Sequence, residues 1–314
     1  MRNHFLWPKS KLNLFKILGF NTVSKVEKKL YKMFPSAHPV LCSSGRVALY
    51  IALKELNLNR KKRLKVFPFA SHCVLNIVGQ ITSPISIEES KNDIELIYHQ
   101  WGYSHKTNMK NIIEDSVDSL YIPGSELLSQ GGIFEIWSLS KILGTSSGGV
   151  LWCKNKEDAE RIRKKITYGP FPIFQWLLRL LSMRIKTLYN YWNAGENGYL
   201  GISIFQSNEI YNRILNWEIL VNDRINKLKM LFDFSIIPND YSSKDRLPCV
   251  INIDPKSFGQ SINSLNKEIG VRNFNKTKNS EFRKFIEVIP IPIHQDVRVD
   301  EIKSLLNTFK KTND

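Results

Sequence analysis

The sequence predicts an α/β protein with a mostly parallel central sheet, helices on both faces and a smaller C-terminal α+β domain. Two observations predict the sheet: short strand-like runs rich in Val, Ile and aromatic residues, and helical patterns that alternate with them in the first half. A chain of 314 residues can form one large or two medium domains with a proper core. We expect a large domain over residues 1–200 and a smaller one over 201–314.

The first half contains the elements expected to build this sheet. Residues 24–36 have the spacing of an amphipathic helix, and "HPVLC" precedes a Ser-Ser-Gly turn and a helix that begins near Arg46. Further strand-like runs are "LKVFPFA", "SPISIE", "IELIYHQ", "NIIEDS", "GIFEIWSLS" and "GGVLWCK". A helix is expected over "NKEDAERIRKKI", because Asn155 suits the cap position and acidic residues fill the first turn.

The second half begins with a change in composition. An apolar stripe over residues 174–192 predicts an amphipathic helix that packs against the core or a dimer partner, or that lies on an anionic membrane surface. Beyond it we expect one long helix over about 205–232. The C-terminal domain then consists of a strand, a helix, a strand and a final helix at "LPCVINI", "PKSFGQSINSLNKEIG", "VIPIPIHQ" and "RVDEIKSLLNTFKK".

The charge and the cysteine pattern limit the classes of function. A net charge of +16 favours an anionic partner: nucleic acid, an acidic membrane surface or a phosphorylated small molecule. The basic residues are spread along the chain without a nucleic-acid-binding motif, which disfavours nucleic acid. Four separated cysteines and scattered histidines predict neither a disulfide framework nor a metal site, and fit the reducing cytoplasm. No run approaches the ~20 apolar residues of a membrane span.

Three features of the first half suit one cofactor. The turn "SSGR", Ser43 to Arg46, lies between a strand and a helix, where free amides and the helix dipole can hold a phosphate. Asp115 ends the run "IIED", at the strand end where parallel sheets bind ligands. Lys141, in "SLSKILGTSSGG", can form a Schiff base with an aldehyde if desolvation lowers its pKa. Taken singly, these residues are equally explained as a helix cap, a second cap and a solvated turn lysine.

The order of these features resembles that of the pyridoxal-phosphate (PLP) enzymes of fold type I, and more closely that of the DegT/StrS family of sugar aminotransferases. The matching stretches cover roughly residues 24–155 and 245–310. They are "KVEKKLYKMFPSAHPVLCSSGRVALYIAL", "VFPFASHCVLNIV", "IYHQWG", "IIEDSVDSL", "WSLSKILGTSSGGVLW", "EIGVRNF" and "VIPIPIHQDVRVDEIKSLL". The resemblance implies PLP as the cofactor and a mostly parallel fold-type-I sheet.

The resemblance also implies a role for particular residues. Lys141 would hold the cofactor aldehyde and move the proton during transamination, and Asp115 would pair with the pyridine nitrogen. The amides of Gly45 and Arg46, with the hydroxyl of Ser138, would bind the phosphate. The ring-stacking position falls at His72, with Phe69 as a near alternative and core packing as the ordinary explanation of either.

The chain departs from the family pattern at several positions. Arg46 replaces a threonine, and either adds a charged phosphate contact or points elsewhere. Asp118 replaces a glutamine or histidine three residues after the cofactor aspartate, where it either acts on the pyridine or faces water. The stretch "GYLGISIFQ" stands where the family reaches the partner subunit's cofactor, so no contact is assigned there.

The resemblance implies an aminotransferase that moves an amino group from L-glutamate to a nucleotide-linked keto-sugar. It further implies a cytoplasmic homodimer that acts in surface polysaccharide or O-antigen precursor synthesis, with residues 174–192 as a candidate peripheral contact to the inner membrane. Two alternatives remain. One is a relative that removes a sugar hydroxyl, although that route replaces the lysine. The other is a non-catalytic protein that binds a membrane or a partner.

Overall fold

A computed structural model describes most of the chain. The described residues are 5–10, 19, 21–67, 70–85, 94–107, 111–167, 198–235, 245–256, 269–275 and 285–312, with a few isolated positions between 168 and 197. The amphipathic stretch 174–192, apart from those positions, and most of the expected helix at 255–270 lie outside the described residues. Within the described part, no helix is long and apolar enough to cross a membrane.

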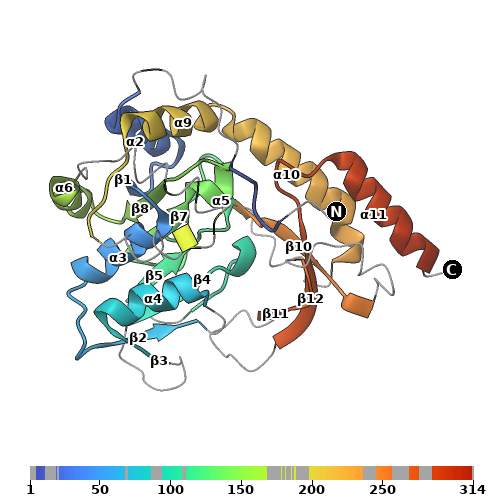
Figure 1. Ribbon diagram of the computed structural model, residues 1–314, viewed down its shortest axis with the longest axis horizontal. Helices are drawn as coiled ribbons and strands as arrows, with labels where there is room; N and C mark the ends of the chain where they lie inside the picture. Colours follow the sequence, from blue (N-terminus) through green and yellow to red (C-terminus); the bar gives the residue numbers. More distant parts are fainter. Residues whose placement is uncertain are drawn as a thin grey trace.

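A seven-stranded sheet forms the centre of the molecule (Figure 1). Its order is β1-β8-β7-β5-β4-β2-β3, in which β8 alone among these strands runs opposite to the others. The predicted mostly parallel sheet is therefore confirmed. The strands are β1 (His38–Cys42), β2 (Arg63–Val66), β3 (Ser83–Ile85), β4 (Ile94–Tyr98), β5 (Ile112–Asp115), β7 (Phe134–Ser138) and β8 (Gly149–Cys153).

Alternation along the strands places helices on both faces of this sheet. Val40 and Cys42 of β1 pack into one hydrophobic cluster, whereas Leu41 between them packs into another. This is the period of two expected for a strand buried on both sides. The first cluster contains residues of α3 (Gly45–Glu55), α4 (His72–Ile81) and α6 (Lys156–Lys165). The second contains residues of α2 (Val23–Met33), α5 (Leu139–Leu143), α9 (Ile204–Ile214) and α10 (Trp217–Leu231).

The C-terminal part forms a second, antiparallel sheet, which Figure 1 shows beside the parallel one. Its order is β10-β12-β11, from β10 (Val250–Ile253), β12 (Phe285–Pro292) and β11 (Arg272–Asn275). The final helix α11 (Val299–Thr312) lies against α10. A short strand pair, β6 (Leu120–Tyr121) with β9 (Arg246–Leu247), joins the two parts of the chain.

Two expectations about the helices differ from the structure. The long helix expected at 205–232 is two helices, α9 and α10, which are separated at Leu215–Asn216. The helix α4 was not foreseen, because its short apolar run "VLNIV" directly follows a strand-like run; its N-cap residue Ser71 makes no side-chain capping hydrogen bond. The helix α9 packs with α2 and α5, so residues on both sides of position 200 share one hydrophobic cluster. The domain boundary expected at residue 200 stays a prediction.

Candidate active site

The turn after β1 has the geometry of a phosphate-binding turn. Ser44 caps α3, and its hydroxyl accepts a hydrogen bond from the Val47 amide at 3.2 Å. The amides of Gly45 and Arg46 begin the helix, where amides have no partner within the helix and the dipole is positive. The turn "SSGR" is therefore a helix cap at a terminus whose dipole suits an anion.

Glycines bring β8 and β7 close to this turn. A Cβ placed on Gly149 would lie 2.3 Å from the carbonyl carbon of Ser44, a distance that real Cβ atoms do not show. A Cβ on Gly45 would lie 3.3 Å from the Cβ of Ser138. Ser138 is nearly buried at the end of β7, and its hydroxyl lies 3.1 Å from that of Ser140. The glycine pair "GG" thus places Ser138 beside the start of α3.

Asp115 ends β5 on the side of the sheet that faces the same space. Its side chain is 4% exposed, and one carboxylate oxygen accepts a hydrogen bond from the Val117 amide at 3.2 Å. Burial raises the pKa of Asp115 to about 7, and Asp118 adds to this rise, whereas Lys141 and the amide oppose it. A cationic group, such as a protonated pyridine nitrogen, would favour the ionised form of this carboxylate.

Lys141 lies in the short helix α5, directly after β7. Its Nζ binds Asp118 Oδ1 at 3.0 Å and lies 4.3 Å from the centre of the Trp7 ring. Burial lowers the pKa of Lys141, but the negative charge of Asp118, with smaller effects of Cys73 and Asp115, raises it above its ordinary value. The expectation of a lowered pKa is therefore corrected: the lysine is paired with a carboxylate rather than only desolvated.

Asp118 faces the site and not water. It is 1% exposed and accepts hydrogen bonds from the Lys141 amine, from Trp7 Nε1 at 2.7 Å and from the Tyr98 hydroxyl. Three donors therefore converge on this one buried carboxylate. Sequence reasoning noticed Asp118 as a departure from the family pattern, but had no signal for Trp7 or Tyr98.

His72 is not placed with the other expected residues. It begins α4 as an exposed side chain, and its Nδ1 lies 3.3 Å from Asn76 Nδ2. The same segment contributes instead the small side chains of Ala70, Ser71, Cys73 and Val74 to the cavity wall. The alternative residue Phe69 lies outside the described residues. The stacking role given to His72 has no support from this geometry, because the helix start turns its ring to the surface.

These groups surround one cavity of about 710 Å³, a size suited to a small molecule. The phosphate turn, the strand-end carboxylate and the lysine all line it, and so do Leu6 and Trp7 from the N-terminal segment. The C-terminal sheet contributes Arg272, Asn273 and Glu287. The residues present fit PLP, because a phosphate site, a buried carboxylate for a cationic ring nitrogen and an amine for an aldehyde share one space.

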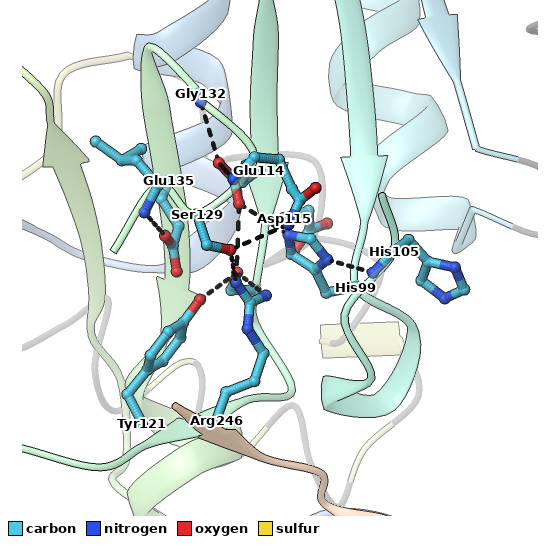
Figure 2. A network of polar contacts seen from close by, with 12 residues as sticks. His99, His105, Glu114, Asp115, Tyr121, Ser129, Gly132, Glu135 and Arg246 are labelled. Carbon is cyan, nitrogen blue, oxygen red and sulfur yellow. Dashed lines mark hydrogen bonds and ion pairs between the residues drawn. The ribbon is translucent and has the colours of Figure 1, made fainter. Parts of the chain in front are cut away.

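A buried polar network lies behind Asp115, on the opposite face of β5 (Figure 2). Glu114 points there, because neighbouring strand residues face opposite sides. It binds His99 Nε2 at 3.0 Å and accepts bonds from the amides of Gln130 and Gly132. The His105 amide donates to His99 Nδ1 at 3.0 Å, so Nε2 carries the proton that Glu114 accepts. Burial, together with Arg246, keeps the pKa of His99 well below its ordinary value.

Arg246 connects this network to β9 of the C-terminal part. Its guanidinium lies 3.9 Å from Glu114, donates to Ser129 at 2.7 Å and stacks at 4.8 Å over the Tyr121 ring. The network fixes the ends of β4 and β5, from which Tyr98 and Asp115 reach the cavity. His99 and Glu114 lie in the stretches "IYHQWG" and "IIEDSVDSL" that resemble the family, but no pattern near Arg246 indicated this contact.

Comparisons with known proteins agree with the fold and with PLP as the cofactor. A family model described as "Putative PLP-dependent aminotransferase" matches residues 26–312. No curated protein matches the sequence. Among solved structures, Helicobacter pylori PseC, an aminotransferase involved in the biosynthesis of pseudoaminic acid, has 12% identity and a TM-score of 0.62, with 98% of each chain covered.

Two further solved structures show the same fold. The aminotransferase TlmJ from Streptoalloteichus hindustanus has 14% identity and a TM-score of 0.64, over 99% of this chain and 98% of that one. S. venezuelae DesV has 15% identity and a TM-score of 0.61, over 94% and 90%. The family match covers most of the chain and its fold is that of these enzymes, so the chain belongs to the family of PLP-dependent aminotransferases.

Proposed function

We propose that this protein transfers an amino group from L-glutamate to a nucleotide-linked keto-sugar, as a cytoplasmic homodimer that supplies surface polysaccharide precursors. The observation that carries the proposal is the shared cavity, which brings the phosphate turn, Asp115 and Lys141 together. PseC, of the same fold, is described as an aminotransferase involved in the biosynthesis of pseudoaminic acid. The net charge of +16 also supports an anionic substrate such as a nucleotide sugar.

A few residues in and beside the cavity would have a part in this reaction. PLP, when bound, supplies an aldehyde and a ring that accepts electrons. The amides of Gly45 and Arg46, with Ser138, would hold its phosphate, and Asp115 would keep the ring nitrogen protonated. Lys141 would hold the aldehyde and, once released, carry a proton between the two reacting carbons. Asp118 keeps the lysine amine oriented into the cavity at 3.0 Å.

Absorption spectroscopy tests the cofactor chemistry. Purified protein with added PLP should show a visible band from cofactor held on Lys141, which borohydride fixes covalently and removes. Lys141→Ala should lack the band, whereas Lys154→Ala, an exposed lysine just after β8, should keep it. A colourless protein that takes up no PLP would contradict the proposed aminotransferase chemistry.

The substrates need a separate assay. With L-glutamate alone, the loaded protein should release one equivalent of 2-oxoglutarate and lose the band. A panel of nucleotide-linked keto-hexoses should then restore the band, and mass spectrometry should detect the amino sugar. If glutamate discharges the cofactor but no keto-sugar restores it, the acceptor class is wrong while the aminotransferase chemistry stands.

A further inference from the structure

The N-terminal segment 5–10 lies against the cofactor cavity, although it is remote in sequence from the parallel sheet. His294 Nε2 donates to the carbonyl oxygen of Phe5 at 2.9 Å, and the Lys9 amide donates to Asp296 at 2.9 Å. Leu6 between them is 6% exposed and packs into the hydrophobic cluster of the C-terminal sheet. The segment is thus fixed on both sides of Trp7.

Trp7 contacts Lys141, which lines the cavity, and Asp118, the carboxylate partner of this lysine. Its Nε1 donates to Asp118 Oδ1 at 2.7 Å, and Lys141 binds the same oxygen at 3.0 Å. The Lys141 amine also lies 4.3 Å from the indole centre, within the range of a cation–π contact. The indole therefore covers the lysine amine and orients its carboxylate partner.

This position determines what the indole meets when the amine is occupied. An atom bonded to Nζ lies about 1.3–1.5 Å from it. The indole centre is 4.3 Å from Nζ, so any such atom lies within about 6 Å of that centre. Among the described residues, α4 and the two residues before it line the cavity with the small side chains of Ala70, Ser71, Cys73 and Val74. Trp7 is thus the aromatic side chain that contacts the lysine amine among the described residues.

We propose that Trp7 is a cofactor-site residue, whose indole forms one wall of the site and packs against the group that Lys141 holds. The N-terminal segment is then a part of the active site and not only a packed end of the chain. This inference rests on the proposed function, since it needs a cofactor on Lys141. It predicts that cofactor binding shields Trp7, and that removal of the indole weakens cofactor binding.

Variants at position 7 test whether removal of the indole weakens cofactor binding. Trp7→Ala, Trp7→Phe and the control Lys9→Ala, whose side chain lies outside the cavity lining, are titrated with two probes. The probes are PLP and pyridoxine 5′-phosphate, which has the ring and phosphate but no aldehyde. Trp7→Ala should weaken both by about 2- to 10-fold, the range of an aromatic packing contact. Trp7→Phe, which keeps a ring, and Lys9→Ala should stay close to wild type.

Footprinting of the wild-type protein tests, without any substitution, whether cofactor binding shields Trp7. Hydroxyl-radical labelling, read by mass spectrometry, should fall at Trp7 on PLP loading, but not at Tyr31, which is 41% exposed on α2. Equal labelling of Trp7 with and without PLP would overturn the inference, even if Trp7→Ala failed to fold. So would a Trp7→Ala protein that binds both probes like wild type. A wild-type protein that takes up no PLP would instead overturn the proposed function and this inference together.

Discussion

Asp115→Asn is expected to change the pH dependence of stability in the cofactor-free protein. Asp115 is 4% exposed. Its burial raises the pKa of the carboxyl group from 3.8 to about 7. Between these two values the native state binds a proton that the unfolded chain has lost, so the native state is favoured at low pH and loses stability as the pH rises. The asparagine has no charge to bury, and its side-chain oxygen can still accept the Val117 amide hydrogen bond.

The magnitude follows from the size of the shift. About three units separate the two values, and at 1.36 kcal/mol per unit the ionised Asp115 lowers the free energy of unfolding by about 4 kcal/mol well above pH 7. Roughly two of those units fall between pH 5 and pH 8, which corresponds to about 3 kcal/mol. Asp115→Asn should therefore stabilise the cofactor-free protein by about 3 kcal/mol more at pH 8 than at pH 5.

Urea unfolding of cofactor-free protein at both pH values measures this difference. The control is Glu157→Gln, which removes an exposed carboxylate from the first turn of α6 and should not reproduce the difference expected for Asp115→Asn. The difference in the free energy of unfolding between Asp115→Asn and wild type could instead be the same at pH 5 and pH 8. That result would show that folding does not bury the charged form of this carboxylate.

At pH 8, added PLP should reverse the order of stability of Asp115→Asn and wild type. A protonated ring nitrogen pairs with the ionised Asp115, so wild type gains the full stabilisation of a bound ligand. Asp115→Asn offers no charge to that nitrogen and should gain less at the same PLP concentration. The two proteins should thus exchange order at pH 8 when PLP is added; an equal gain in both would remove Asp115 from the ring-nitrogen role.

Two further predictions concern the lysine and the phosphate turn. Asp118→Asn removes the main charge that raises the pKa of Lys141, so the pH midpoint of the PLP loading rate should move to lower pH. An unchanged midpoint would show that the 3.0 Å ion pair does not control the Lys141 amine. Gly149→Ala would place a Cβ 2.3 Å from the Ser44 carbonyl carbon, so the turn must move, with a loss of about 1–3 kcal/mol in urea unfolding and weaker PLP binding. The matched control is Gly124→Ala, where a Cβ meets no atom within 4 Å, although its φ of +87° carries some backbone strain of its own.

Several parts of the site were predictable because their signal is local. A strand followed by "SSGR" and an apolar helix predicts β1, the turn and α3, and the structure has them at His38–Cys42 and Gly45–Glu55. Asp115 and Ser138 end their strands, and the ends of parallel strands gather at one edge of a sheet. For these residues, position along the chain was enough to predict a shared cavity.

Other parts depended on contacts that no local pattern contains. Trp7 and Asp118 are 111 residues apart, and their hydrogen bond exists only because the N-terminal segment is held by His294 and the C-terminal sheet. The same holds for Arg246, which reaches Glu114 from β9.

The sequence by itself determined the strands of the parallel sheet and the three groups that suit PLP, since periodicity and strand ends are properties of neighbouring residues. Only the tertiary structure decided that Lys141 is held by Asp118, that Trp7 covers both, and that His72 faces the surface. The physical reason is burial: the charge state of Lys141 and Asp115 depends on which distant side chains exclude water from them, and packing alone determines that.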